Sequence, residues 1–139
     1  QTFTENQCHN FVFTVYFDTV NSSYYVGLFI TVVRAPEFIR LNPRVIEIVQ
    51  EFFAAKKPVA SICHGPQILT AAGVLKGVKA TAYPAVGPDI TLAGGTYVEV
   101  PADQAVVDEA AQLVTAPAWP GDTAILAEFV KLLGAKIEI

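Results

Sequence analysis

The chain of 139 residues has the length of one domain, and its 53% hydrophobic and 16% charged residues indicate a globular protein with a large core, which excludes a disordered tail. Its formal net charge of −4 and its lack of a Lys/Arg cluster argue against a nucleic-acid partner. The longest apolar run, residues 24–33, falls short of the roughly 18 residues that a membrane span needs, so no membrane partner is expected.

The sequence begins with Gln1 and contains no methionine, so we expect a single domain over 1–139 that is incomplete at its N-terminus. Two cysteines, Cys8 and Cys63, are too few for a disulfide scaffold, which favours a reduced, cytoplasmic protein, although one bridge between them is compatible with the sequence. Adjacent residues seldom ligate one ion together, so the pairs Cys8-His9 and Cys63-His64 do not favour a zinc site.

In chain order, the first predicted elements are two strands and a helix. Residues 11–17 are rich in aromatic and β-branched side chains and predict a strand, and 18–25 carry turn residues. Residues 26–33 are apolar without alternation, which is typical of a strand buried on both faces. Asn42 and Pro43 then predict the N-cap and first residue of an amphipathic helix over 43–56.

The rest of the chain continues the alternation of strands and helices. Pro58 ends the preceding helix, 58–63 predicts a short apolar strand, and 65–75 a second helix. Asp122 and Gly134 are the expected caps of a last helix over 122–134. Between these helices, the pattern predicts a helical turn at 87–93 and short strands within 79–85, 96–100, 104–108 and 112–116. The alternation indicates the α/β class, with a parallel sheet covered by helices.

The segment Ser61-Ile62-Cys63-His64-Gly65 carries the main chemical signal. It has the form small-x-nucleophile-x-small at a strand-to-helix junction, the pattern of a nucleophile elbow. The helix N-terminus that follows is expected to lower the pKa of the Cys63 thiol. His64 is a candidate base but needs a carboxylate to orient it. The alternative is an ordinary buried cysteine, which is what most free cysteines are.

Several segments together resemble a known family. "KPVASICHGPQILTAAGVLKG" followed by "TAYPAV" is similar to the DJ-1/PfpI superfamily, in particular its PfpI-like branch and plant-type members. "RAPEFIRLNPRV", "LAGGTYVEV" and "AEFVKLLG" strengthen the resemblance, which covers nearly the whole chain. It implies a flavodoxin-like three-layer α/β sandwich with a mostly parallel sheet, related to class I glutamine amidotransferases.

The resemblance also assigns roles to individual residues. Cys63 matches the family nucleophile, and His64 the histidine beside it. Glu37 matches an acidic residue that completes the triad across a subunit interface in PfpI-like members, which implies a homo-oligomer, a dimer or larger. Read from the sequence alone, Glu37 is a solvated residue near a helix start. The residues expected to border the substrate are Val33, Arg34, Gly65, Tyr83 and Trp119. No metal and no cofactor are implied.

The sequence departs from the family pattern in two places. Family members begin with a strand and a helix, and a glutamate after that strand contacts the nucleophile; both elements are missing from this sequence. In addition, Thr31-Val32-Val33 stands where the family has Pro-Gly-Gly, whose amides help to form the oxyanion pocket. A β-branched residue there would narrow that pocket. Either the activity is impaired, or the correspondence at this place is inexact.

Three functions follow from these features. The leading hypothesis is a cofactor-independent glyoxalase that converts methylglyoxal to lactate through Cys63, with deglycase action on early glycated amines, in stress defence. The second is a PfpI-like intracellular cysteine peptidase that uses Cys63, His64 and a partner subunit's glutamate at position 37. The third is a non-enzymatic redox or stress sensor in which Cys63 is oxidised to sulfinic acid.

Overall fold

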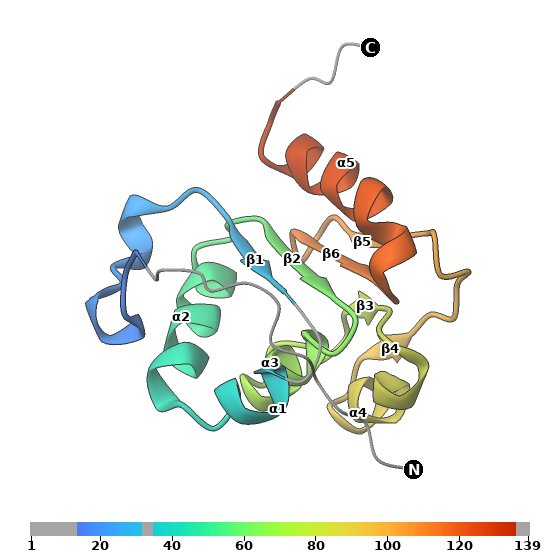
Figure 1. The fold of residues 1–139 in the computed structure, drawn as a ribbon, viewed down its shortest axis with the longest axis horizontal. Coiled ribbons are helices and arrows are strands. Elements are labelled where there is room, and N and C mark those ends of the chain that lie inside the picture. The colour runs from blue at the N-terminus through green and yellow to red at the C-terminus, as the bar shows by residue number, and fades with distance from the viewer. Residues whose placement is uncertain (1–13, 32–34, 136–139) are drawn as a thin grey trace.

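A four-stranded sheet forms the centre of the computed structural model, which describes residues 14–31 and 35–135 (Figure 1). The strand order is β1-β2-β6-β5. β1, β2 and β6 are parallel, and β5 is antiparallel to β6. The strands are β1 (Leu28–Ile30), β2 (Val59–Ile62), β5 (Val106–Asp108) and β6 (Leu113–Ala116). The mostly parallel α/β arrangement predicted from the sequence is therefore confirmed.

Helices cover both faces of this sheet and give the molecule three layers (Figure 1). Helices α2 and α3 pack on one face, and α5 packs on the other. A second, two-stranded parallel sheet pairs β3 with β4. The helices are α1 (Ala35–Ile39), α2 (Pro43–Ala54), α3 (Pro66–Ala71), α4 (Gly87–Leu92) and α5 (Asp122–Leu132); the second sheet is β3 (Lys79–Ala80) and β4 (Thr96–Tyr97). None of the helices in the described ranges is long and apolar enough to cross a membrane.

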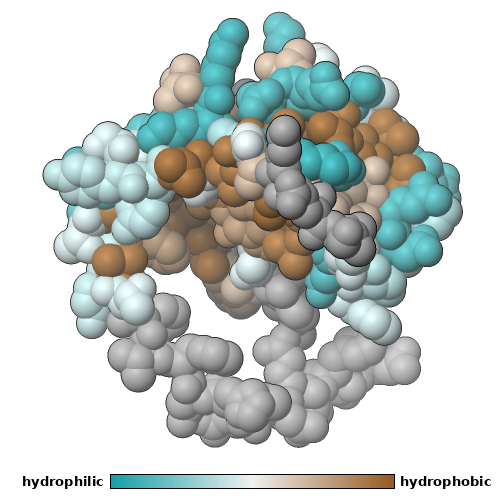
Figure 2. Space-filling view, turned by 90° about the horizontal axis from the view of Figure 1, so that it is seen from above, coloured by the Kyte–Doolittle hydropathy of each residue, from teal (hydrophilic) through white to brown (hydrophobic). Residues whose placement is uncertain are grey.

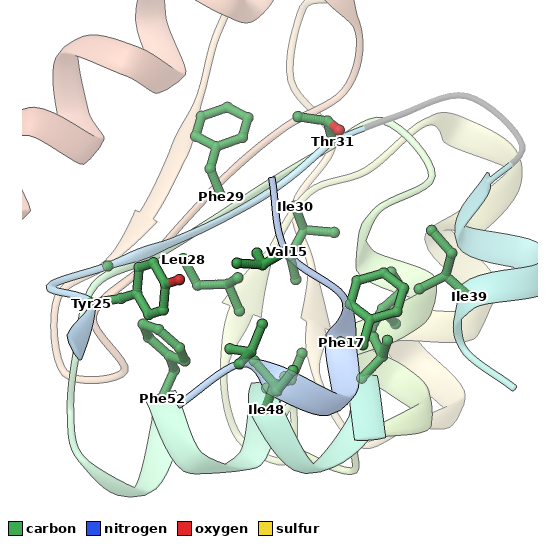
Figure 3. Close-up of a pocket in the computed structure, with 15 residues that line it drawn as sticks. Val15, Phe17, Tyr25, Leu28, Phe29, Ile30, Thr31, Ile39, Ile48 and Phe52 are labelled. Carbon is green, nitrogen blue, oxygen red and sulfur yellow. The ribbon is translucent and has the colours of Figure 1, made fainter. Parts of the chain in front are cut away.

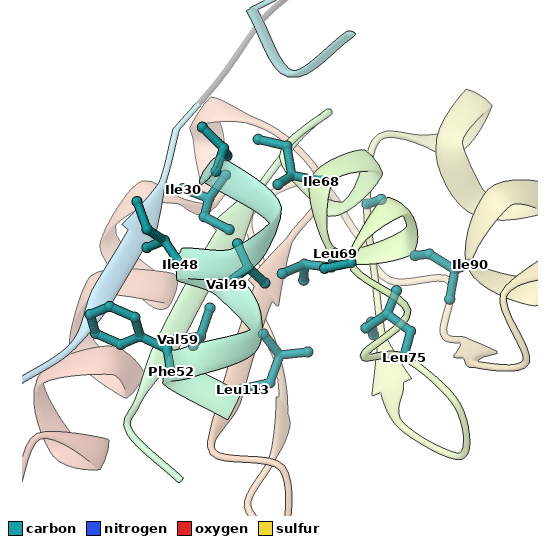
Figure 4. Close-up of a cluster of buried hydrophobic side chains, with 14 of the residues drawn as sticks. Ile30, Ile48, Val49, Phe52, Val59, Ile68, Leu69, Leu75, Ile90 and Leu113 are labelled. Atoms are coloured by element: carbon teal, nitrogen blue, oxygen red, sulfur yellow. The ribbon is translucent and has the colours of Figure 1, made fainter. Parts of the chain in front are cut away.

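The core divides along β2, because successive side chains of a strand point to opposite faces. Val59 joins the large cluster beneath α2 and α3 (Figure 4), whereas Ala60 and Ile62 join the smaller cluster beneath α5. All four residues of β2, and all four of β6, are buried. This burial on both faces explains why the segment 58–63 is apolar without alternation.

Helix α2 begins as the sequence predicts, although it ends at Ala54 rather than at residue 56. The Asn42 side-chain oxygen accepts a hydrogen bond from the backbone N–H of Arg44 at 2.9 Å, and Pro43 is the first helical residue. One apolar stripe faces the sheet and is buried, with residues three or four positions apart: Val45, Ile48, Val49 and Phe52. Burial of this stripe fixes α2 against β1 and β2 (Figure 4).

The strand predicted over 11–17 is wrong where the structure describes it. Residues 14–16 are irregular, and Phe17–Thr19 form a 3-10 helix followed by a second one at Ser22–Tyr24. Their backbone N–H groups bond locally, for example from Thr19 to the Tyr16 carbonyl at 3.0 Å. Aromatic and β-branched residues favour a strand only where a neighbouring strand pairs with them, and none of the described strands does so here. Residues 11–13 lie outside the described ranges.

Two helix boundaries also differ from the prediction. Helix α3 ends at Ala71 rather than at residue 75, because Gly73 adopts a left-handed conformation with φ of 71°. Asp122 is the first residue of α5, so Gly121, which has no side chain to cap the helix, occupies the N-cap position. Gly134 follows the end of α5 with φ of 83°, as predicted for a helix stop.

Candidate active site

Cys63 lies at the sharp turn between β2 and α3. Its φ of 60° is in the left-handed region, which residues other than glycine rarely adopt. Two hydrogen bonds hold it there: its N–H donates to the Ala116 carbonyl, and its carbonyl accepts from the Tyr83 N–H, both at 2.9 Å. This is the geometry of a nucleophile elbow, in which surrounding structure maintains a strained residue.

Gly65 allows this turn to close. A Cβ atom at position 65 would lie 2.5 Å from the Ser61 Oγ and 3.0 Å from the carbonyl oxygens of Ile30 and Ile62. The backbone N–H of Gly65 already donates to the Ile62 carbonyl at 2.9 Å. Gly65 was expected to border the substrate, but its visible contribution is its small size, because its N–H group is occupied.

The structure brings Cys63 and His64 into contact. The Cys63 Sγ lies 3.2 Å from the His64 Nδ1, within hydrogen-bond distance for sulfur, and both residues are half-buried. The imidazole also stacks on the ring of Tyr83, with ring centroids 4.9 Å apart and planes inclined by 21°. The thiol therefore has a basic nitrogen beside it, and that nitrogen belongs to a ring with an aromatic neighbour.

The electrostatics of the thiol differ from the prediction. Burial raises the pKa of Cys63 above its ordinary value, and the backbone N–H of His64, which lowers the pKa, only partly offsets this. This direction is opposite to the lowering expected from the helix N-terminus. The first amides of α3 are occupied, because Gln67 N–H donates to the His64 carbonyl and Ile68 N–H to the Gly65 carbonyl. Desolvation changes the pKa of Cys63 more than the hydrogen bond from the His64 N–H does.

Of the other predicted site residues, neither Glu37 nor Trp119 makes a hydrogen bond with Cys63 or His64 among the described residues. Glu37 is half-buried on α1 and makes no hydrogen bond or ion pair with His64 among the described residues. Trp119 follows β6 in a short 3-10 helix and is 80% exposed, so it is not packed in the core. Val33 and Arg34 lie outside the described residues.

Sequence reasoning missed a group of buried hydroxyls behind the elbow. Ser61 and Thr115 are partners in the β2–β6 register, and the Thr115 Oγ1 accepts the backbone N–H of Thr81 at 2.8 Å. Ser61 and Thr81 are fully buried, and their hydroxyls have no hydrogen-bond partner within the described part of the chain. The small polar residue Ser61 beside the cysteine was the only sequence feature that pointed to this group. The sequence does not show that residues 61, 81 and 115 lie close together in the fold.

Within 14–31 and 35–135, no three His, Cys, Asp or Glu side chains lie close enough together to hold a metal ion. Cys8 and His9 fall outside these ranges.

An apolar cavity of about 380 Å³ lies apart from Cys63, against the outer edge of β1 (Figure 3). Side chains of β1, of α2 and of the segment 15–25 point into it, including Leu28, Ile48 and Phe52. Among the residues that the structure describes, neither Cys63 nor His64 lines it, and no carboxylate, imidazole or amine does. Figure 2 shows apolar surface gathered toward the middle of one face of the molecule, with hydrophilic side chains along much of its border. The described lining of the cavity is thus suited to apolar groups.

Comparison with known proteins identifies the family. Residues 1–132 match the profile of the DJ-1/PfpI family. The chain belongs to this family. It is 49% identical over 138 residues to Protein DJ-1 homolog D of Arabidopsis thaliana, a match that covers 99% of this chain and 35% of the relative. It is 45% identical over 118 residues to Deglycase PfpI of Pyrococcus furiosus, covering 84% of this chain and 68% of that relative.

A third family relative is Protein/nucleic acid deglycase 2 of Escherichia coli, 34% identical over 118 residues, with 85% of this chain and 66% of the relative covered. The chain thus spans about a third of the plant relative's length and about two thirds of the microbial ones.

Solved structures agree with the DJ-1/PfpI assignment. A two-domain protein with DJ-1/ThiJ/PfpI-like and ferritin-like domains from Anabaena variabilis superposes with a TM-score of 0.72 at 32% identity, over 85% of this chain and 32% of that one. Schizosaccharomyces pombe DJ-1 superposes with a TM-score of 0.63 at 26% identity, over 81% of this chain and 56% of that one. The flavodoxin-like α/β fold expected from the sequence is confirmed.

Proposed function

We propose that this DJ-1/PfpI domain is a deglycase-type enzyme that acts on methylglyoxal and on the early adducts of methylglyoxal with amines, with Cys63 as the nucleophile. The single observation that carries the proposal is Cys63 at φ of 60° in the elbow, with the His64 Nδ1 3.2 Å from its sulfur. A free structural cysteine has no need of a strained backbone or of an adjacent base. The names of the microbial relatives support the same class of reaction.

The proposed reaction converts methylglyoxal and water into lactate. The Cys63 sulfur bonds to the aldehyde carbon, and the carbonyl oxygen takes up a proton to give a hemithioacetal. A base removes the proton from that carbon and a proton is returned to the neighbouring carbon, while the hydroxyl proton moves to the former ketone oxygen, which leaves a thioester of lactate. Water then attacks the thioester carbon, the carbon–sulfur bond breaks, and lactate and the Cys63 thiol are released.

His64 is the candidate base for the first step. Its Nδ1 is the ring nitrogen that faces the sulfur, so it is placed to accept the thiol proton as the carbon–sulfur bond forms. Because burial raises the pKa of Cys63, the thiol is mainly protonated at neutral pH, and a base that removes its proton during attack is needed. The backbone N–H of His64 also faces the sulfur and is a candidate donor to the developing oxyanion.

The test is lactate production from methylglyoxal without glutathione. We expect the wild-type protein to form lactate, and Cys63→Ala to lose the activity. Cys63→Ser is the matched control for side-chain volume and should be equally inactive, because a serine hydroxyl is far less acidic than a thiol. Full activity in Cys63→Ala would refute the mechanism. A chemical scavenger of free methylglyoxal separates the two branches, because direct action on a preformed amine adduct would persist in its presence.

An oligomer is part of the proposal because Glu37 does not reach His64 within one subunit. On α1 and just beyond it, Phe38 is 72% exposed and Leu41 is 75% exposed, so apolar surface flanks this carboxylate. Exposed apolar groups of this kind commonly mark protein–protein contacts. We expect light scattering to find a dimer or a larger species, and Phe38→Glu to dissociate it. If the dissociated variant keeps full activity, a glutamate supplied by the partner is not required.

The peptidase alternative depends on that same interface. It requires Cys63, His64 and a partner's carboxylate at one site, so casein hydrolysis should vanish in Phe38→Glu and in Glu37→Gln. Hydrolysis by the wild type that is lost in both variants would favour a peptidase. The sensor alternative is weakened by the raised pKa of Cys63, because thiolates react with peroxide much faster than thiols do.

A further inference from the structure

Tyr83 contacts both members of the Cys63–His64 pair. Its backbone N–H donates to the Cys63 carbonyl at 2.9 Å, and its ring stacks on the His64 imidazole at 4.9 Å between centroids. Tyr83 comes directly before the 3-10 helix Pro84–Val86, which fixes the chain beside the elbow. One residue, twenty positions along the chain from Cys63, thus holds the nucleophile through its backbone and the base through its side chain.

The imidazole needs such a support. A histidine that serves a nucleophile is normally oriented by a hydrogen bond from its second ring nitrogen to a carboxylate or carbonyl. Among the described residues, His64 has no such hydrogen bond or ion pair; its side-chain partners there are the Cys63 Sγ and the Tyr83 ring. An imidazole without a second contact can change χ1 and χ2 among several rotamers. Stacking on a fixed ring restricts it to the orientations in which the two planes stay nearly parallel.

We propose that Tyr83 is a positioning residue whose ring keeps the His64 Nδ1 against the Cys63 thiol. The inference rests on the proposed nucleophilic role of Cys63 and goes beyond the expectation that Tyr83 borders the substrate. One face of the Tyr83 ring stacks on His64, and the Tyr83 backbone N–H donates to the Cys63 carbonyl. No hydrogen bond of the phenol oxygen occurs within 14–31 and 35–135, so the ring, and not the hydroxyl, carries the role.

The test measures how fast iodoacetamide alkylates Cys63, with mass spectrometry to follow the site. This small reagent reports the state of the thiol without needing a substrate pocket. The interaction energy of an aromatic pair of this kind corresponds to a factor of about 2 to 10 in rate, so Tyr83→Leu should slow alkylation near neutral pH by that factor. Tyr83→Phe keeps the ring and should stay close to the wild-type rate. Tyr24→Leu, which changes an 82% exposed tyrosine over α2, is the matched control and should have no effect.

The decisive measurement is a double-mutant cycle with His64→Ala. If Tyr83 acts through the imidazole, Tyr83→Leu has no further effect on alkylation in the His64→Ala background. The proposal is overturned if Tyr83→Leu slows alkylation equally in both backgrounds, if Tyr83→Phe is as slow as Tyr83→Leu, or if His64→Ala alkylates as fast as wild type. Thermal melting of each variant shows that it is folded.

The outcomes also separate this inference from the proposed reaction. Alkylation is measured without any aldehyde, so wild-type protein that shows the cycle but forms no lactate contradicts the reaction and leaves the role of Tyr83 intact. Where lactate is formed, Tyr83→Leu should lower kcat with little change in KM. A rise in KM alone would instead indicate contact with the substrate and would refute the positioning role.

Discussion

Replacement of Gly65 by alanine is the most direct test of the elbow geometry. The added Cβ would lie 2.5 Å from the Ser61 Oγ and 3.0 Å from the carbonyl oxygens of Ile30 and Ile62. The hydroxyl can rotate away, but the two carbonyls belong to β1 and β2 and cannot. The φ of Gly65 is −49°, which alanine tolerates, so the whole effect of Gly65→Ala is steric.

Overpacking a core by one methyl group costs about 1–3 kcal/mol. For a domain of this length that corresponds to a fall in Tm of about 3–15 °C. The elbow is the segment that must shift, and displacement of a reacting group by about 1 Å can cost roughly 100-fold in rate. We therefore expect Gly65→Ala to melt early and to lose most lactate formation. Differential scanning calorimetry and the lactate assay measure the two effects.

Two further variants separate the causes. Ser61→Ala/Gly65→Ala removes the shortest contact and should regain part of the lost stability. Gly73→Ala is the control: its φ of 71° costs alanine about 1–2 kcal/mol, but no atom lies within 4 Å of the added Cβ, so stability should fall while Cys63 chemistry stays unchanged. A steric role of Gly65 in the elbow is ruled out if Gly65→Ala matches wild type in both Tm and activity, or if Gly73→Ala loses activity to the same extent.

Three other predictions concern single groups. Because burial raises the pKa of Cys63, its alkylation rate should still increase with pH at values above the ordinary thiol pKa, and a rate plateau below neutral pH would contradict this. The contribution of this thiol to stability is present below the pKa of the unfolded state and should be lost as pH rises through the pKa of the folded state. Asp108 is buried, and although desolvation raises its pKa, hydrogen bonds from the N–H groups of Lys79 and Ala111 lower it overall. Asp108→Ala should cost about 1–3 kcal/mol at neutral pH in urea unfolding, and wild-type stability from this group should fall as pH drops through that lowered pKa. Asn42→Ala should cost about 0.5–2 kcal/mol through loss of the α2 cap, and Asn42→Asp should retain most of it.

Short sequence patterns predicted the helices and strands whose formation depends on residues close together in the chain. Asn42 and Pro43 start α2 as predicted, and the apolar segment 58–63 contains β2 because both faces of that strand are covered. The strand predicted over 11–17 fails at 14–17 because strand formation depends on a partner, which residue types alone do not reveal. Asp122 was predicted as a cap from its residue type, but it is the first residue of α5, so Gly121 occupies the N-cap position.

The sequence predicted the sharp turn at Cys63 but not the contacts around it. The spacing of small residues around Cys63 predicted the turn, and φ of 60° is the strain that such a turn imposes. The helix N-terminus led us to expect a lowered thiol pKa, whereas burial of Cys63, which depends on the tertiary structure, raises it. The stacking of Tyr83 on His64 joins residues from separate loops, and no local pattern encodes that contact.

The conformation of Cys63 is therefore a tertiary property. Its N–H is bound by Ala116 at the end of β6, its carbonyl by Tyr83, and Gly65 closes against the carbonyl of Ile30 at the end of β1. A left-handed cysteine persists only where several such contacts outweigh its strain. Unfolding removes the burial that raises the thiol pKa, so at neutral pH the unfolded chain holds the larger thiolate fraction. In the proposed mechanism, the reactivity of Cys63 therefore depends on its placement beside His64 and not on a more acidic thiol.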